Sequence, residues 1–335
     1  MARIVCFGEI LLRLTAPGRE LLLQTPRFEA NVGGAEANVA VGLAKLGHDS
    51  VMVSVLPGNA LGDAARGELR RHGVDVTAVT EGPGRLGLYF LAPGAGLRAS
   101  EIVYDRTYSA FAQAPVDLID WAPLLDGADL LHLSGITPAL GPVSAAAGAR
   151  AVDAANAAGV PVSFDGNYRA SLWDSWDSDP RSALTRLIAG ADILFGNHRD
   201  ISLLLGRSFS GEDSGRRREA ADAVFAAFPR LRHVASTSRH VDDADRHRIA
   251  ARLDAPGGQW QTEEIVVAGI VDRIGAGDAF AVGLLHALLS GSGEADAVRS
   301  GLALTCLKHS LPGDASLFGQ RDIDGFLAGE LDVRR

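Results

Sequence analysis

Residues 272–280 read DRIGAGDAF and stand between a strand-like apolar run and an apolar helix predicted over Ala279–Leu289. Two glycines, Gly275 and Gly277, flank Ala276 and let the backbone turn tightly, so that successive N–H groups can point outward. The helix that follows adds the positive end of its dipole. We therefore predict that Gly275, Ala276 and Gly277 bind an anion and stabilise the charge that develops on a transferring phosphoryl group.

Asp278 lies at the mouth of this predicted anion site. A carboxylate there can accept the proton of an attacking hydroxyl as a general base. For a bare Gly-x-Gly-Asp, the alternative interpretation is a glycine turn with an N-cap aspartate. A dinucleotide fold is disfavoured, since Gly-x-Gly-x-x-Gly is absent and the glycine turn comes late in the chain; this argues against an NAD-dependent dehydrogenase.

Outside this motif, short β-branched runs alternate with Ala-rich helical stretches. This alternation predicts an α/β fold with a mostly parallel sheet covered on both faces. The expected strands are Ile4–Phe7, Val51–Val55, Leu130–Leu133, Val160–Phe164, Ile193–Phe195, Val234–Thr237 and Ile265–Val267. The expected helices include Ala35–Leu46, Pro142–Ala158, Pro180–Ala189, Glu219–Phe228 and Ala279–Leu289.

Two stretches interrupt this alternation with strands and turns but no helix, Leu11–Phe28 and Arg85–Tyr108. They predict a small sheet beside the main domain, placed to cover a ligand. We therefore divide the chain into a lid, residues 11–28 and 85–108, and a main α/β domain, residues 1–10, 29–84 and 109–335.

The composition excludes several classes of function. The 335 residues carry a net charge of −9, which disfavours a nucleic-acid surface. No run approaches the roughly 18 apolar residues that a membrane span needs, and no signal peptide precedes the first strand-like run. Cys6 and Cys306 lie in apolar runs without a metal-binding spacing, which predicts buried thiols and a cytoplasmic location.

A second glycine motif enters a helix near the N-terminus, where residues 31–40 read NVGGAEANVA. Its paired glycines, Gly33 and Gly34, permit close approach of the backbone to a ligand. Asn38, one turn into the helix, offers donors and an acceptor to a sugar hydroxyl. An ordinary helix-start turn is the alternative interpretation of this motif.

The two motifs together resemble the signatures of the ribokinase-like (PfkB) family of carbohydrate kinases, and the resemblance spans the whole chain. It implies a three-layer αβα ribokinase-like fold with a small β lid, with ATP as phosphoryl donor and Mg²⁺ as cofactor. In that family the Gly-Gly pair and the Asn face the sugar, which gives this role to Gly33, Gly34 and Asn38. Glu9 matches the family position that reaches the same sugar, although it could be an exposed strand-end acid.

Residues 164–173 read FDGNYRASLW and resemble the Asp-Pro-Asn-x-Arg…Leu-Trp segment of keto-deoxygluconate kinases and fructokinases, with Gly166 in place of the proline. Arg169 could bind a carboxylate through two hydrogen bonds, or form a structural ion pair. Asn167 is assigned to the nucleotide side of the site.

The lid stretch carries Tyr89, Tyr104 and Arg106. Its Tyr-x-Arg…Ser-Ala pattern resembles the keto-deoxygluconate kinases, in which this Tyr and Arg contact the acid end of the substrate; surface placement of Arg106 is the alternative. The implied substrate is a sugar acid, 2-keto-3-deoxygluconate. The rivals are a fructokinase or other neutral-sugar kinase, and a non-catalytic sugar-binding regulator.

The nucleotide side is expected near Asn197, Thr237 and Arg239, with Asp200 placing Mg²⁺ through water where the family has a Glu. Lys308, in a tail that resembles the Leu-Lys-His-Thr-x-x-Gly-Asp run of the subfamily, could lie near the nucleotide or be a helix-end cation. Residues 240–247 read HVDDADRH and depart from the Gly- or Ser-rich loop of the family. We interpret them as a solvated loop rather than a His/Asp metal site.

An exposed face of the lid sheet favours a homo-oligomer formed through the lid. The sequence does not decide the oligomeric state, the stereochemistry of the sugar, or whether a monovalent cation is also required.

Overall fold

The first strand, β1 Arg3–Phe7, shows why the sheet must be covered on both faces. Ile4 and Cys6 are buried in one apolar core, while Val5 and Phe7 are buried in another. Because successive side chains of a strand point to opposite faces, a strand that is apolar throughout needs a helical layer on each side.

The large sheet has ten strands in the computed structural model, which describes residues 1–330. The order is β13-β12-β11-β10-β9-β8-β1-β4-β5, and β14 also pairs with β12. The seven strands from β11 to β5 along this path run parallel to one another, whereas β12 is antiparallel to each of its partners. The remaining bounds are β4 Asp49–Pro57, β5 Val79–Gly82, β8 Leu130–Ser134, β9 Val162–Asp165, β10 Ile193–Phe195, β11 His233–Asp243, β12 Arg246–Ala255, β13 Gly258–Gln261 and β14 Ile265–Ala268.

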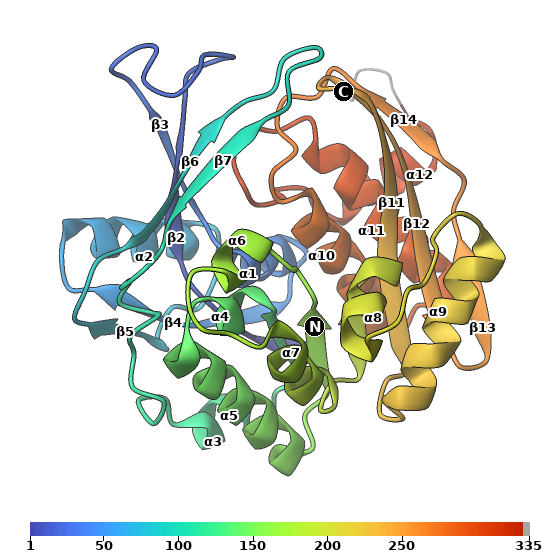
Figure 1. Cartoon of the computed structure of the whole chain (residues 1–335), viewed down its shortest axis with the longest axis horizontal. Coiled ribbons are helices and arrows are strands. Elements are labelled where there is room, and N and C mark those ends of the chain that lie inside the picture. The colour runs from blue at the N-terminus through green and yellow to red at the C-terminus, as the bar shows by residue number, and fades with distance from the viewer. Residues whose placement is uncertain (331–335) are drawn as a thin grey trace.

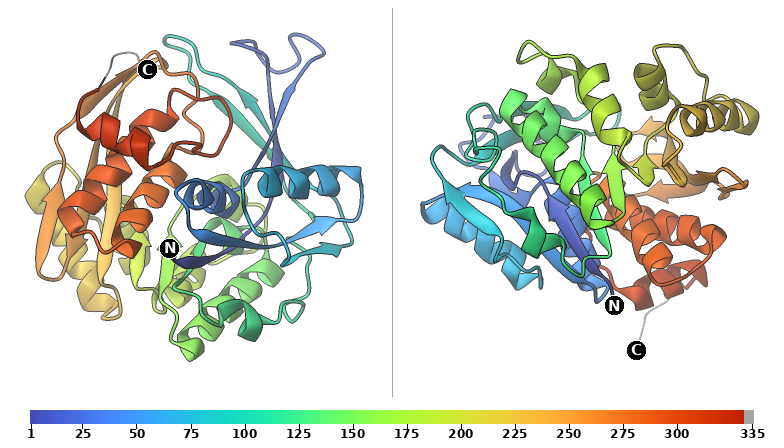
Figure 2. Two further views of the ribbon diagram at one scale, coloured as in Figure 1. Left: turned by 180° about the vertical axis from the view of Figure 1, so that it is seen from behind. Right: turned by 90° about the horizontal axis from the view of Figure 1, so that it is seen from below.

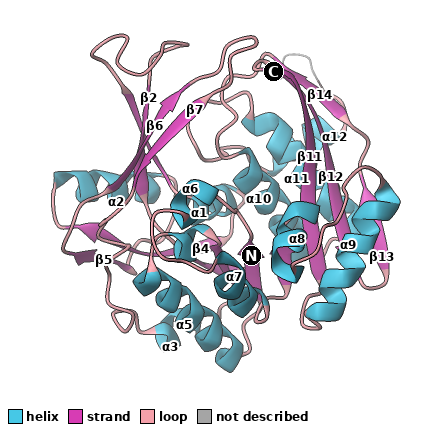
Figure 3. Cartoon of the chain, viewed as in Figure 1, coloured by secondary structure: helices cyan, strands magenta, loops and turns pink. Residues whose placement is uncertain are grey.

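Helices cover both faces of this sheet (Figures 2 and 3). One core packs against α1 Ala35–Lys45, α2 Ala60–Arg71, α10 Ala276–Leu289, α11 Glu294–Lys308 and α12 Gln320–Leu327. The other packs against α3 Trp121–Leu125, α4 Ile136–Ala139, α5 Pro142–Ala158, α6 Ala170–Trp173, α7 Pro180–Ile188, α8 His198–Leu205 and α9 Ser214–Ala227. The predicted three-layer αβα ribokinase-like fold is confirmed, and α5 matches its predicted range residue for residue.

A separate four-stranded sheet forms the lid and stands beside the main domain (Figure 1). Its order is β3-β2-β6-β7, with bounds β2 Leu11–Thr15, β3 Glu29–Gly33, β6 Gly87–Ala92 and β7 Glu101–Asp105. The lid sheet includes β3, whereas the sequence analysis placed residues 29–33 in the main domain. Strand β3 belongs to the lid because it pairs antiparallel with β2 before the chain enters α1. The pairing of two chains through the lid stays a prediction.

The expected solvated loop at residues 240–247 is instead part of a β-hairpin. Strand β11 continues to Asp243, the chain turns, and β12 begins at Arg246. The sequence reading missed this hairpin because its polar residues concealed the strand alternation. Within residues 1–330, no helix is long and apolar enough to cross a membrane.

Candidate active site

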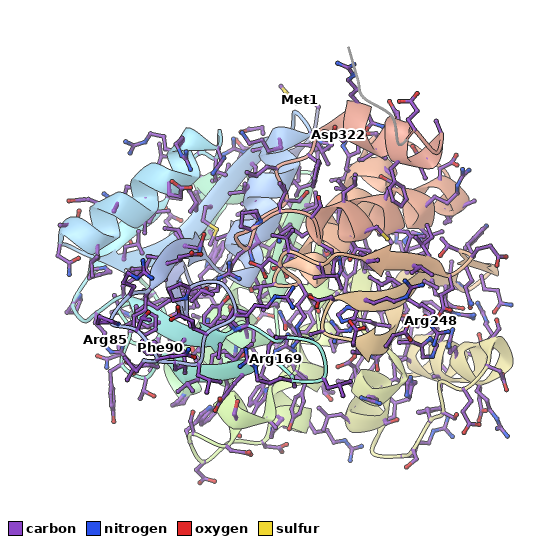
Figure 4. All side chains as sticks on the ribbon, turned by 90° about the horizontal axis from the view of Figure 1, so that it is seen from above. Met1, Arg85, Phe90, Arg169, Arg248 and Asp322 are labelled. Carbon is purple, nitrogen blue, oxygen red and sulfur yellow. The ribbon has the colours of Figure 1, made fainter. Side chains whose placement is uncertain are left out.

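A cavity of about 1070 Å³ opens between the lid and the carboxyl ends of the main-sheet strands. Parallel strands bring their carboxyl ends to one edge, where ligands bind in open α/β sheets. Figure 4 places Arg169 between Phe90 of the lid and Arg248 of the hairpin. The wall gathers most of the predicted site residues, namely Gly34, Asn38, Tyr89, Tyr104, Arg106, Asn167, Arg169, Asn197, Asp200, Thr237, Arg239, Gly275, Ala276, Gly277 and Asp278.

The glycine turn lies at the start of α10. Gly275 has a φ of 76° and is the N-cap residue of that helix. A β-carbon at Gly275 would lie 1.6 Å from the Asp314 carbonyl oxygen, so no other residue fits there. Gly277 has open space beside it and is exposed on the cavity wall. The Ala276 N–H donates to the Arg273 carbonyl oxygen at 3.3 Å, so the turn brings the amides of Gly275 and Gly277, with the amino end of α10, to the cavity.

Asp278 lies in the first turn of α10 and accepts a 2.6 Å hydrogen bond from Asn38 Nδ2 on α1. Burial raises the pKa of Asp278 to about 7, and the nearby Glu36 and Asp314 carboxylates add to the rise. The Asn38 hydrogen bond and Arg169 oppose it, since both stabilise the ionised form. A carboxyl group that titrates near neutral pH is suited to take up a proton during catalysis.

Arg106 is held by Glu9, which follows β1. Both Nε and Nη2 of Arg106 lie 2.6 Å from Glu9 Oε2. Glu9 is only 1% exposed and is not on the cavity wall, so it orients Arg106 from behind rather than facing a sugar. Gly34, at φ 140°, packs so closely that a β-carbon would lie 2.1 Å from the Glu9 carbonyl oxygen.

Three further arginines on the cavity wall, Arg169, Arg239 and Arg273, lie close enough to interact electrostatically. Burial lowers the pKa of Arg239, and the neighbouring Arg273 and Arg169 lower it further. Guanidinium groups that gather at a cavity wall favour an anionic ligand such as a phosphate chain. Arg273 escaped the sequence reading, although it lies inside the DRIGAGDAF motif.

Two carboxylates lie close to these arginines. Asp200 Oδ2 accepts a 2.8 Å hydrogen bond from the Asn197 backbone N–H, and the Asn197 side chain caps α8. The sequence analysis did not identify Asp165, at the end of β9. Burial raises the pKa of Asp165 to about 7, and the nearby carboxylates of Asp278 and Asp200 add to the rise. In the described chain, no group of three or more His, Cys, Asp or Glu is arranged to hold a metal. The pair suits Mg²⁺, which prefers oxygen ligands and keeps several waters.

Two further predicted residues lie off the wall. Lys308 is 0% exposed, and its Nζ donates to the Leu311 carbonyl oxygen at 3.1 Å, so the proposed contact with a nucleotide is corrected to a buried structural position. Gly33 packs against the Asp314 carboxylate, where a β-carbon would lie 2.4 Å from Oδ2.

The tip of the β11–β12 hairpin touches the lid over the cavity, at the top of Figure 1. Arg19 forms two hydrogen bonds to Asp245, at 2.7 and 2.6 Å. The Ala244 N–H donates to the Gly96 carbonyl oxygen at 2.8 Å. The acidic tip therefore joins the lid to the main domain.

An anion turn and an acid–base carboxyl beneath a lid are what a kinase for small hydroxylated molecules requires. Residues 1–317 match the family model for pfkB family carbohydrate kinases. The chain belongs to this family and is a carbohydrate kinase.

Known proteins similar to this chain align with it over nearly its full length. A 2-dehydro-3-deoxygalactonokinase of Haloferax volcanii is 30% identical over 328 residues, which cover 98% of this chain and 97% of the relative. The crystal structure of 2-dehydro-3-deoxygluconokinase from Thermotoga maritima is 37% identical with a TM-score of 0.93, covering 98% and 100%. A putative ribokinase II from E. coli, solved with ATP and Mg²⁺, shares the fold at 20% identity and a TM-score of 0.83, covering 98% and 100%.

Proposed function

We propose that this kinase transfers the γ-phosphoryl group of ATP to the primary hydroxyl of a 2-keto-3-deoxy sugar acid. The substrate that we favour is 2-keto-3-deoxygluconate, and the product is 2-keto-3-deoxy-6-phosphogluconate. One observation carries the proposal: the Asp278 carboxyl and the glycine turn share a cavity with the tyrosines and arginines that suit an acid sugar.

In the proposed reaction, Asp278 takes the proton of the primary hydroxyl as the oxygen forms its bond to the γ-phosphorus. The bond between that phosphorus and the bridging oxygen of ADP breaks. The amides of Gly275 and Gly277 stabilise the charge on the transferring group, because they are already oriented by the turn and by α10. Asp200 and Asp165 would hold Mg²⁺ through water, and the metal would neutralise phosphate charge.

Nucleotide binding is proposed at the arginine-rich wall. Asn167, Asn197, Thr237 and Arg239 lie on this wall, where they could contact the phosphates or ribose of ATP. The same fold binds ATP and Mg²⁺ in the E. coli ribokinase II structure. Contact between the lid and the hairpin would exclude water and limit hydrolysis of ATP.

Recognition of the acid group is proposed to rest mainly on Arg169, with Tyr104 as a hydroxyl donor. The Tyr89 hydroxyl already donates to Asp314, so Tyr89 would line the sugar pocket without donating to the acid group. Arg106 has Nε and Nη2 engaged by Glu9, which leaves Nη1 free for the substrate. A guanidinium fork held in this way can bind a carboxylate with a fixed orientation. The relatives are named for two stereoisomers, the gluconate and the galactonate forms, so the proposed class includes both.

The test is an ADP-release assay with Mg²⁺–ATP over both keto-deoxy acids, fructose, and an analogue that lacks the carboxylate. We expect kcat/KM for the acids to exceed that for the neutral analogue by about 100-fold, since a lost charged hydrogen bond costs roughly 1.5–3 kcal/mol. An Arg169→Met variant should lose most of this preference while it retains activity on fructose.

Equal kcat/KM for the acid and its neutral analogue would exclude the acid-sugar assignment and favour a neutral-sugar kinase. Sugar binding without ADP release from any substrate would indicate a regulator instead of an enzyme.

A further inference from the structure

Arg13 is a buried arginine in the middle of lid strand β2 that the reaction above does not use. Its side chain is 2% exposed and reaches out of the lid toward the main domain. Nη2 lies 2.7 Å from Asp272 Oδ2, and Nε lies 3.1 Å from Asp314 Oδ1. Residues 13 and 272 are 259 positions apart, so this contact joins the lid to the segment that carries the anion turn.

The two aspartates that Arg13 bridges, Asp272 and Asp314, both contact the backbone in or next to the anion turn. Asp272 Oδ1 accepts the Ile274 N–H at 2.9 Å, and Asp272 Oδ2 accepts the Gly313 N–H at 3.2 Å. The Asp314 backbone packs directly on Gly275, where only a glycine fits. A shift of either aspartate would therefore change the direction of the amides at the turn.

The same cluster touches the sugar side of the cavity. Tyr89, on lid strand β6, lies on the cavity wall and donates its hydroxyl to Asp314 Oδ2 at 2.8 Å. Strands β2 and β6 pair directly, with Arg13 opposite Tyr89 in register. One carboxylate thus connects a lid residue at the sugar with the backbone that supports the phosphate site.

Arg13 supplies positive charge to the two carboxylates of this cluster. Burial raises the pKa of Asp314 and the nearby Asp272 carboxylate raises it further, while Arg13, ahead of Lys308, opposes the rise. Removing one partner of a buried ion pair leaves the other charge uncompensated, which strongly disfavours that arrangement. Without Arg13, Asp314 would take up a proton or move, and the support of Gly275 would move with it.

We propose that Arg13 is a positioning residue that couples the closed lid to the geometry of the anion turn, acting through Asp272 and Asp314. Arg13 is not among the residues that line the cavity, so it acts from outside the site. The inference rests on the proposed phosphoryl transfer and adds that the lid orients the amides as well as covering the substrate.

The experiment compares Arg13→Met and Arg13→Lys with the control Arg3→Met, which removes the Arg3–Asp49 ion pair in β1, away from the cavity. We expect kcat of Arg13→Met to fall by about 100-fold, the size of a lost oxyanion donor, while the KM values for sugar and ATP change by less than about threefold. Arg13→Lys should recover part of kcat, and Arg3→Met should retain it.

A second measurement needs no sugar turnover. Binding of ADP with Mg²⁺ and aluminium fluoride, a mimic of the transferring phosphoryl group, should weaken in Arg13→Met by a factor similar to the loss of kcat. ADP binding without fluoride should not change. Thermal melting and circular dichroism establish that each variant is folded at the assay temperature.

Retention of kcat and of aluminium fluoride binding in folded Arg13→Met would overturn the inference. So would a lower melting temperature with kcat unchanged, because that outcome reduces Arg13 to structural support. Failure of the wild type to phosphorylate any sugar acid would instead refute the proposed substrate. The aluminium fluoride measurement would still decide the role of Arg13.

Discussion

Replacing Asn38 with leucine should move the pH dependence of catalysis to higher pH. The Asn38 side chain donates a 2.6 Å hydrogen bond to Asp278, and this bond lowers a pKa that burial has raised to about 7. Leucine has a similar volume but cannot donate. The ionised form of Asp278, which is the proposed base, loses its hydrogen-bond donor, so the pKa of Asp278 must rise further.

The size of the shift follows from the strength of such a bond. A hydrogen bond to a charged group contributes roughly 1.5–3 kcal/mol, and 1.36 kcal/mol corresponds to about one pKa unit. The acidic limb of kcat/KM should therefore move up by about 1 to 2 pH units. At pH 7 the ionised fraction falls from about one half to between roughly a tenth and a hundredth, a 5- to 50-fold loss. At pH 9 the ionised fraction returns to between about one half and nine tenths.

The assay is ADP release with saturating Mg²⁺–ATP, measured at fixed ionic strength across the limb. Tyr104→Phe is the matched control, since it alters a proposed sugar contact without touching Asp278. It should raise KM and leave the limb in place. An acidic limb that stays where it is in Asn38→Leu, or that moves to lower pH, would refute the assignment of that limb to Asp278.

Three further outcomes are expected. Asp278→Asn should lower kcat by at least about 1000-fold, and unchanged turnover would contradict the role of Asp278 as base. The same variant should have a higher melting temperature at pH 8. The folded pKa of Asp278 lies above the ordinary value of 3.8, so ionisation of Asp278 lowers the stability of the fold as pH rises from 3.8 through 7. Exchanging the charges of Arg19 and Asp245 should restore, in the double variant, the sugar KM that each single reversal raises; no recovery would show that the lid does not depend on their contact. Arg273→Ala should raise the KM for ATP by about tenfold and spare the KM for sugar, and the reverse pattern would place Arg273 on the sugar side.

Local signals in the sequence were sufficient to predict the helical and strand layers. Strands such as β1 and β4 place apolar residues on both faces, and this pattern has few solutions other than a sheet between two helical layers. The glycines of the anion turn are a local signal, since Gly275 adopts a positive φ that glycine tolerates best, whereas the packing of Asp314 on it is a tertiary contact. The hairpin at residues 240–247 was mistaken for a loop because its strand pairing, rather than its composition, makes it a strand.

The amino-acid sequence by itself determined the glycine turn, the carboxylate beside it and the layered architecture, because each depends on residues within a few positions of one another. Tertiary structure alone decided which polar and charged side chains meet. Arg106 reaches Glu9 across 97 positions, Asn38 reaches Asp278 across 240, and Arg13 reaches Asp272 across 259. Such pairs depend on how the lid and the main sheet pack together, and ion pairs leave no spacing in a single sequence from which they could be recognised.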